Sequence, residues 1–158
     1  SALSKFSGIS RRMQFLGKLG QTVVIDDYGH HPTEIKNTIL TLRESFPESE
    51  VSMVFQPHRF TRTKDLYEGF VEVLKSVDRL ILLEIYSAGE EPIDGISSNA
   101  LLESIKNAGL EDAVLAKSND QAYELIGNII SKDKGVLLMQ GAGNISEIST
   151  KLTREIEE

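Results

Sequence analysis

The sequence predicts an α/β fold, in which helices cover both faces of a mostly parallel sheet in a three-layer α/β/α sandwich. Short, nearly continuous apolar runs at 22–26, 51–55, 79–84 and 136–140 alternate with amphipathic stretches, which is the pattern of repeated βαβ units. Runs without strict polar alternation are typical of strands that are covered on both faces. The Gly-rich segment 13–23 precedes these runs and predicts two short strands in an antiparallel hairpin at the sheet edge.

Helices are expected between these strands, with a weaker strand at 113–116. The expected helical ranges are 32–45, 64–76, 98–108, 120–131 and 146–157. Pro32 suits a first helical turn, Ser98 and Asn119 are candidate N-caps, and Gly109 is a candidate left-handed C-terminal cap. Apolar residues recur at helical spacing within these ranges and predict core-facing stripes. The arrangement is Rossmann-like, with the antiparallel edge hairpin added to a parallel sheet.

The composition limits the class of protein. A chain of 158 residues with 40% hydrophobic content suffices for a single domain, 1–158, and is short for two. With 17 basic and 24 acidic residues, the net charge of -7 argues against nucleic acid as a partner, because phosphate-backbone binding needs basic surface. Cysteine is absent, which excludes disulfides and thiolate metal sites. The longest apolar runs fall short of a membrane span, so we expect no membrane association and a cytoplasmic location.

All three histidines lie in two polar clusters, each directly after a predicted strand. The carboxyl ends of parallel strands meet at one edge of a sheet, so both clusters are expected to face one crevice. In the first cluster the strand ends at Asp26 and Asp27, and His30 and His31 lie at the following corner. A carboxylate in the crevice suits a ribose diol, although both aspartates could equally end the strand and cap the next helix. Adjacent corner side chains diverge, which makes a shared metal ion the weaker interpretation.

The second cluster places His58, Arg59 and Arg62 close together in the sequence. If this segment is helical, the two guanidinium groups share a face and can hold a carboxylate or phosphate bidentately. Positive charge at a helix N-terminus opposes the helix dipole, so a bound anion would relieve that cost. The plainer interpretation is a solvated basic patch. We favour an anionic ligand.

Two further loops follow predicted strands, at 86–92 and 141–145. Their glycines suit either a tight turn or the close approach of backbone amides to a ligand. Arg11 and Arg12 precede the hairpin, where they can reach a nucleotide phosphate or remain solvated. No Gly-x-x-x-x-Gly-Lys-Ser/Thr segment occurs, so the chain is not a complete P-loop ATPase. If ATP is handled, its main phosphate cradle lies elsewhere.

Five segments together resemble the C-terminal domain of the Mur ligases, and within them the branch that joins L-alanine to UDP-N-acetylmuramate. The segments are 6–12, 26–34, 55–63, 86–90 and 140–145, so the resemblance spans nearly the whole chain. Its most specific part is the Gln-Pro-His-Arg-Phe-Thr-Arg sequence within the third segment. The related murein tripeptide ligases share the Arg-Arg and His-His-Pro elements but differ after the second predicted strand.

The resemblance implies one domain of a three-domain, ATP- and Mg²⁺-dependent ligase of peptidoglycan synthesis. In this family a carboxylate is phosphorylated and the amine of an amino acid attacks the acyl phosphate. The implied ligands are UDP-N-acetylmuramate, L-alanine and ATP. The implied partner is the rest of the same polypeptide, which holds the UDP sugar, the P-loop and most magnesium ligands, and without which this domain is expected to be inactive.

The resemblance also implies roles for particular residues. Arg12 would meet the nucleotide phosphates and Asp27 the ribose. The catalytic candidates are His30, His31 and Arg59, and the substrate-binding candidates are Tyr28, His58, Arg59 and Arg62.

Two other classes of function remain open from the sequence. The three histidines and two aspartates could surround one or two metal ions in a hydrolase, which would act without further domains. A non-catalytic module for a nucleotide or an acidic metabolite would bind its ligand unaided. The ligase interpretation predicts weak binding at best, because the ligand is shared between domains.

Overall fold

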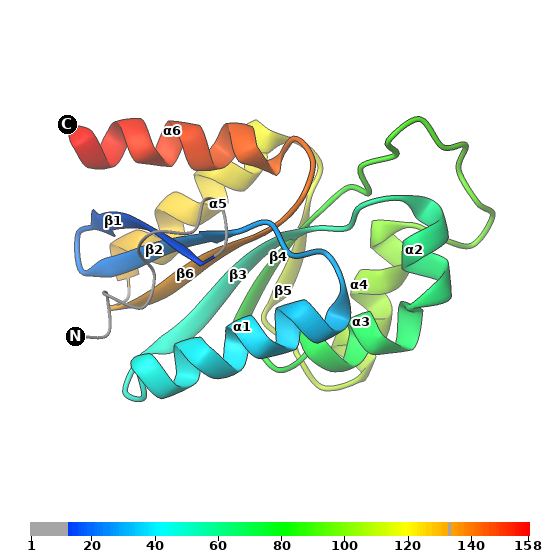
Figure 1. The fold of residues 1–158 in the computed structure, drawn as a ribbon, viewed down its shortest axis with the longest axis horizontal. Helices are drawn as coiled ribbons and strands as arrows, with labels where there is room; N and C mark the ends of the chain where they lie inside the picture. Colours follow the sequence, from blue (N-terminus) through cyan, green and yellow to red (C-terminus); the bar gives the residue numbers. More distant parts are fainter. Residues whose placement is uncertain (1–12, 133) are drawn as a thin grey trace.

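A computed structural model describes residues 13–132 and 134–158, and its sheet has six strands (Figure 1). The strands are β1 (Gln14–Leu19), β2 (Thr22–Asp27), β3 (Glu50–Gln56), β4 (Arg79–Leu83), β5 (Ala113–Ala116) and β6 (Gly135–Gly141). The helices are α1 (Pro32–Ser45), α2 (Phe60–Asp65), α3 (Tyr67–Leu74), α4 (Ser98–Asn107), α5 (Asn119–Lys132) and α6 (Ile145–Glu157). All predicted strands are present, and the α/β class is confirmed.

The strand order is β1-β2-β6-β3-β4-β5. Only β1 and β2 pair antiparallel, and the other four neighbouring pairs are parallel. The predicted edge hairpin on a mostly parallel sheet is therefore confirmed. β6 lies between β2 and β3, since Gln140 is in register with Asp27 on one side and with Phe55 on the other. The last strand thus separates the two strands that precede the histidine clusters.

Helices cover both faces of the sheet, with α1, α3 and α4 on one face and α5 and α6 on the other (Figure 1). Successive side chains of a strand point to opposite faces. On β6, Leu138 therefore packs in the core under α1 and α3, whereas Leu137 and Met139 pack in the core under α5 and α6. Both cores need apolar residues, which is why these strands read as unbroken apolar runs.

The structure corrects one predicted helix. The range 64–76 was expected to form a single helix, but the segment begins earlier, at Phe60, and breaks at Leu66, whose φ of -114° and ψ of 21° are not helical. The half-buried Leu66 still packs against the core, so the apolar spacing continues through the break and conceals it. Two short helices, α2 and α3, replace the expected one.

Both candidate N-caps are also corrected by one position. Ser97, not Ser98, caps α4 by accepting from the amide of Ala100 at 3.0 Å. Ser98 is buried, and its hydroxyl donates to the carbonyl of Leu83. In front of α5, the Oγ of Ser118 rather than Asn119 accepts from the third residue, Gln121. Burial of Ser98 decides the first pair. In the second pair, the side chain of Asn119 donates instead to the carbonyl of Asn144 and to Glu147.

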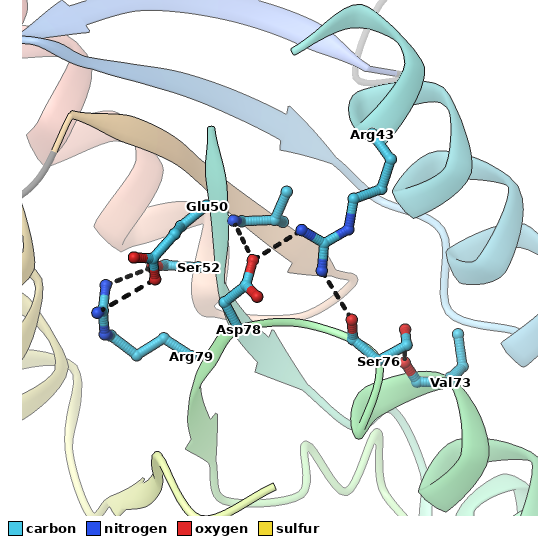
Figure 2. A network of polar contacts seen from close by, with 8 residues as sticks. Arg43, Glu50, Ser52, Val73, Ser76, Asp78 and Arg79 are labelled. Atoms are coloured by element: carbon cyan, nitrogen blue, oxygen red, sulfur yellow. Dashed lines mark hydrogen bonds and ion pairs between the residues drawn. The ribbon is translucent and has the colours of Figure 1, made fainter. Parts of the chain in front are cut away.

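Different groups of polar side chains lie at the amino ends and at the carboxyl ends of the strands. At the amino ends of β3 and β4, Arg43 donates to Asp78 at 2.7 Å, and Arg79 lies near Glu50 and Ser52 (Figure 2). The first contact joins α1 to the residue before β4, and the second joins β4 to β3. At the opposite edge, where β2, β6, β3, β4 and β5 end, the connecting loops carry the histidine clusters; we call it the carboxyl edge.

In the part of the chain that is described, no helix has the length and apolar character needed to cross a membrane.

Candidate functional site

Three aromatic rings from three different loops meet at the carboxyl edge. The ring centroids of His30, after β2, and His58, after β3, lie 5.8 Å apart. Tyr86, after β4, stacks on His58 with centroids 5.4 Å apart and an interplanar angle of 21°. We call His30, His58 and Tyr86 the ring cluster. Its members come together because parallel strands end at one edge, as the sequence predicted for the two histidines.

The backbone extends the sheet into this cluster. His58 and Tyr86 form an isolated parallel bridge beyond the ends of β3 and β4. Its hydrogen bonds run from the amide of Arg59 to the carbonyl of Tyr86 at 2.8 Å and from the amide of Tyr86 to the carbonyl of Pro57 at 2.9 Å. The two loops are thus held together by main-chain bonds, which fixes the distance between their side chains.

Arg62 folds back from α2 onto His58. Its Nη1 lies 3.0 Å from Nδ1 of His58 and donates to the carbonyl of the same residue at 3.1 Å. A guanidinium group can only donate, so Nδ1 accepts and the proton of the neutral ring lies on Nε2. Burial lowers the pKa of His58 below its usual value of 6.5, and the charges of Arg62, His30 and Arg59 lower it further, against a smaller opposing effect of Glu90. His58 is therefore a neutral donor at pH 7.

Arg59 precedes α2 in an unusual backbone conformation, with a φ of 75°. Its Nη1 lies 3.7 Å from Oε2 of Glu90, and its side chain is 43% exposed. The sequence predicted that Arg59 and Arg62 would jointly hold an external anion. That anion site stays a prediction. In this structure each guanidinium group also has an internal partner, Arg62 with His58 and Arg59 with Glu90.

The structure separates the two adjacent histidines. His30 belongs to the ring cluster, and its Nδ1 donates to the carbonyl of Tyr28 at 3.4 Å. His31 is exposed and N-caps α1, where Nδ1 accepts from the amide of Thr33 at 3.2 Å and Glu34 completes a capping box. Pro32 occupies the first turn, as predicted. Tyr28 lies on the same loop with its side chain exposed. The structure does not bring His31 into the ring cluster.

Asp26 and Asp27 point to opposite faces of the sheet, as expected for neighbours on a strand. Asp26 accepts from the hydroxyl of Ser149 on α6 at 3.1 Å. Asp27 is 3% exposed and accepts from the hydroxyl of Thr38 at 3.1 Å, the amide of Met13 at 3.1 Å and the side-chain amide of Gln140 at 2.8 Å. Asp27 also lines a shallow pocket of about 210 Å³ between its loop and α1.

Two buried glutamines tie the loops of the carboxyl edge together. Gln140 bridges Asp27 and the carbonyl of Gly29, and its own Oε1 is buried without a hydrogen-bond partner. Gln56, on the other face, donates to the side chain of Asn144 at 2.6 Å and accepts from the amide of Ile145 at 2.9 Å. Each amide therefore reaches from its own strand end to the loop that follows a neighbouring strand.

Comparison with known proteins assigns this arrangement to a family. The sequence pattern described as "Mur ligase, glutamate ligase domain" matches residues 11–143, which is most of the chain. The chain belongs to the Mur ligase C-terminal domain family. The resemblance stated from the sequence is thereby confirmed at the level of the family.

Solved structures agree with this assignment to the Mur ligase family. UDP-N-acetylmuramate-alanine ligase from Thermotoga maritima is 26% identical, with a TM-score of 0.75 over 97% of this chain and 31% of that chain. Folylpolyglutamate synthase from Mycobacterium tuberculosis shares the fold at 14% identity and a TM-score of 0.66, over 92% of this chain and 32% of that chain. The Mur ligase domain thus spans about a third of the length of these enzymes.

A third solved structure shares this Mur ligase fold and is a single domain. It is a domain from a putative UDP-N-acetylmuramate:L-alanyl-gamma-D-glutamyl-meso-diaminopimelate ligase of Haemophilus ducreyi, 23% identical, with a TM-score of 0.62. The match covers 92% of this chain and 99% of that chain. That solved chain therefore consists of this domain alone.

Three residues in or near the ring cluster were not among the sequence-based candidates. Tyr86, Glu90 and Gln140 lie in the two Gly-containing loops or at their borders, which were noted but not assigned roles. They follow or end β4 and β6, the two strands that flank β3, and this strand order has no local signal in the sequence. Arg12, predicted to meet the nucleotide phosphates, lies outside the described residues. Within the described part of the chain, no three His, Asp or Glu side chains are grouped to hold a metal ion.

Proposed function

We propose that this domain completes an ATP-dependent ligase of peptidoglycan synthesis that joins L-alanine to the carboxylate of UDP-N-acetylmuramate. The observation that carries the proposal is the gathering of Arg59, Arg62, His30 and His58 around one edge of the sheet. Both reactants carry a carboxylate, and the reaction develops further negative charge on the attacked carbon's oxygens. Cationic and N–H donors held in fixed positions stabilise such charge.

The residues of this site have distinct proposed tasks. Arg59, whose side chain is 43% exposed, is proposed to hold a substrate carboxylate. Arg62 fixes the tautomer of His58, so that Nε2–H of His58 can donate to an anionic oxygen. His30, on the adjacent loop, is proposed to accept a proton from the attacking amine, within reach of the same ligand. His31 and Tyr28 are kept as candidates at the carboxyl edge. His31 caps α1 and lies next to His30, and the side chain of Tyr28 is exposed.

The nucleotide side of the proposal rests on the pocket beside Asp27. Its lining residues are Met13, Asp27, Gly29, Glu34, Asn37, Thr38 and Thr41. Apart from Met13 and Gly29, these residues have acidic, amide or hydroxyl side chains, and none is basic, so the pocket suits the hydroxyl groups of a ribose and not a triphosphate. ATP supplies the phosphoryl group that activates the carboxylate. Its phosphates and Mg²⁺ are therefore proposed to lie mainly on the central domain, with Arg12 reaching them.

The proposal explains why this domain by itself is expected to be inactive. The ligand would lie between domains, and closure would exclude the water that hydrolyses an activated carboxylate. Because the reaction consumes ATP, we place the enzyme in the cytoplasm. The other interpretations, a hydrolase or an independent binding module, each require function in the isolated chain.

A reconstitution assay tests the proposal. ADP release is measured with UDP-N-acetylmuramate, L-alanine, ATP and Mg²⁺, using this chain, a separately expressed fragment with the N-terminal and central domains, and their mixture. Activity only in the mixture is expected, with a loss of at least about a hundredfold in Arg59→Ala, the order found when one charge-stabilising donor is removed. Arg154→Ala, a matched change on the exposed end of α6, should keep full activity.

The same assay can reject the proposal. Turnover by this chain alone would favour a hydrolase. Activity that requires an amino acid other than L-alanine would keep the ligase chemistry and change its substrate. If the Arg59→Ala mixture matched the unmodified mixture, the ring cluster and its arginines would not be the site.

A further inference from the structure

Glu90 has no assigned role in the proposed chemistry, but it contacts both Thr61 and Arg59. Its Oε2 accepts from the hydroxyl of Thr61 at 2.6 Å, and its Oε1 accepts from the amide of Thr61 at 3.1 Å. The same carboxylate lies 3.7 Å from Nη1 of Arg59. Glu90 therefore joins the loop after β4 to the start of α2.

A tight turn delivers Glu90 to this position. The amide of Glu90 donates to the carbonyl of Ser87 at 3.0 Å, and both central residues, Ala88 and Gly89, have positive φ, 51° and 86°. Glycine tolerates this conformation without strain. The turn begins one residue after Tyr86, whose main chain is bonded to Pro57 and Arg59. Main-chain hydrogen bonds therefore connect the loop that carries Glu90 to the segment that carries Arg59.

The charge on Glu90 is retained. Hydrogen bonds from the hydroxyl and the amide of Thr61 lower the pKa of Glu90 below its usual value, with a smaller contribution from Arg59. The Glu90 side chain is 20% exposed, against 43% for Arg59. The carboxylate is therefore an ionised group, anchored by Thr61, that faces a more exposed cation.

The distance between Arg59 and Glu90 shows whether Glu90 uses up the N–H donors of Arg59 or only holds the guanidinium group in place. At 3.7 Å the two groups form an ion pair but not a direct hydrogen bond. The N–H donors of Arg59 are therefore not consumed by Glu90 and stay available to a second anion. A long, flexible arginine side chain gains most from such an anchor, because fewer conformations must be lost when the ligand binds.

From this geometry we propose that Glu90 is a positioning residue, which orients the Arg59 guanidinium toward the ligand at the carboxyl edge without itself touching the ligand. That the ligand is the amino-acid or acyl substrate rests on the proposed ligase function. The orientation of Arg59 does not rest on it. The two parts of the proposal are therefore tested separately.

The first test uses the isolated 158-residue chain, since the solved structure of a relative with this fold consists of the single domain. Nitrogen-15 relaxation of the Arg59 Nε–H group reports how well the side chain is ordered. We expect an ordered group in the unmodified chain, a mobile one in Glu90→Ala, and intermediate order in Glu90→Gln and Thr61→Val. Glu91→Gln, an exposed neighbour, is the matched control and should resemble the unmodified chain.

Equal order of Arg59 in the unmodified and Glu90→Ala chains would overturn the positioning role. If Glu90→Ala fails to fold, Glu90→Gln and Thr61→Val decide the question. Glu90→Gln keeps an oxygen for the Thr61 amide but loses the charge that faces Arg59. Thr61→Val keeps the charge but loses the hydroxyl anchor.

The second test uses the full-length ligase. Glu90→Gln should raise the KM of the substrate held by Arg59 about tenfold while leaving the KM of ATP and the unfolding temperature unchanged, with partial recovery in Glu90→Asp. Equal changes in both KM values would indicate a general structural role and overturn the proposal. If the unmodified enzyme shows no ligase activity, the proposed function fails, and the relaxation measurement alone still decides whether Glu90 orients Arg59.

Discussion

Arg62 lies four residues after His58 and donates from a single nitrogen to both Nδ1 and the carbonyl oxygen of that residue. The contact crosses the boundary between the β3 loop and α2. It fixes the proton of neutral His58 on Nε2 and holds a positive charge beside the ring. His58 is thereby kept from becoming a cation in a site that already contains two arginines.

The first prediction concerns the pKa of His58. Arg62→Gln removes the positive charge but not the burial that is the larger cause of the shift. The pKa of His58 should therefore rise toward 6.5 and remain below it. NMR titration of the His58 ring in the isolated chain measures this, with Arg154→Gln as the control. A His58 pKa that does not move would mean that burial alone sets it.

The lowered pKa has a consequence for stability. Between the folded-state pKa and 6.5, the unfolded chain binds more protons at His58 than the folded chain does, so stability rises with pH in this window. The contribution is fully present above pH 6.5 and is lost as the pH falls through the window. Urea unfolding at several pH values should show a shallower dependence in His58→Gln than in the unmodified chain. An identical dependence would contradict this assignment.

The second prediction tests the buried amide of Gln140. Gln140→Met keeps the approximate volume but removes the donor to Asp27 and to the carbonyl of Gly29. A buried polar group left unsatisfied costs about 1–3 kcal/mol, so the free energy of unfolding should fall by about that amount. Gln14→Met, on an exposed position of β1, should change stability by no more than about 0.5 kcal/mol. Equal effects of the two changes in urea unfolding would show that the Gln140 bonds contribute little.

The third prediction compares three glycine-to-alanine changes. At Gly143 a Cβ would lie 2.8 Å from Oε1 of Gln56 and 2.9 Å from Cγ of Tyr86, at a φ of 120°. Crowding of this kind costs about 1–3 kcal/mol, and the displaced Tyr86 should disturb the ring cluster. Gly20 has a φ of 59° but open space around it, so only the backbone cost of about 1–2 kcal/mol is expected.

Gly127 completes this comparison. It lies inside α5 with nothing near its Cβ position, so alanine should stabilise the domain by about 0.5–1 kcal/mol. Urea unfolding of the three variants gives the order. In addition, NMR shifts of the His58 ring should change in Gly143→Ala only. A Gly143→Ala domain as stable as the unmodified one would show that the loop after β6 can move away.

The fourth prediction concerns the amino ends of the strands. Asp78 accepts from Arg43 at 2.7 Å and from the amide of Val51 at 2.8 Å (Figure 2). Asp78→Asn keeps an acceptor for Val51 and loses only the ion pair, whose side chains are both about a third exposed. The expected cost is therefore at most about 1 kcal/mol and should shrink at high salt. Asp78→Ala, which also removes the acceptor, should cost more and respond less to salt.

Much of the fold was predictable because its signals are local. Four apolar runs and the hairpin identified the sheet, and Pro32 and Gly109 marked helix ends as expected, the latter with a φ of 123°. The break at Leu66 was not predictable, since that residue continues the apolar spacing. The caps were missed by one position, because burial of Ser98 is a tertiary property.

The sequence by itself determined the strands, the class of fold, the placement of His30, His58, Arg59 and Arg62 after two strands, and the resemblance to the Mur ligases. These follow from short-range periodicity and from motifs that are contiguous in the chain. Only the tertiary structure decided that β6 lies between β2 and β3, that His30 and not His31 meets His58, and that Glu90 faces Arg59. Those relationships depend on strand order and loop closure, which join residues far apart in the chain and have no local signal.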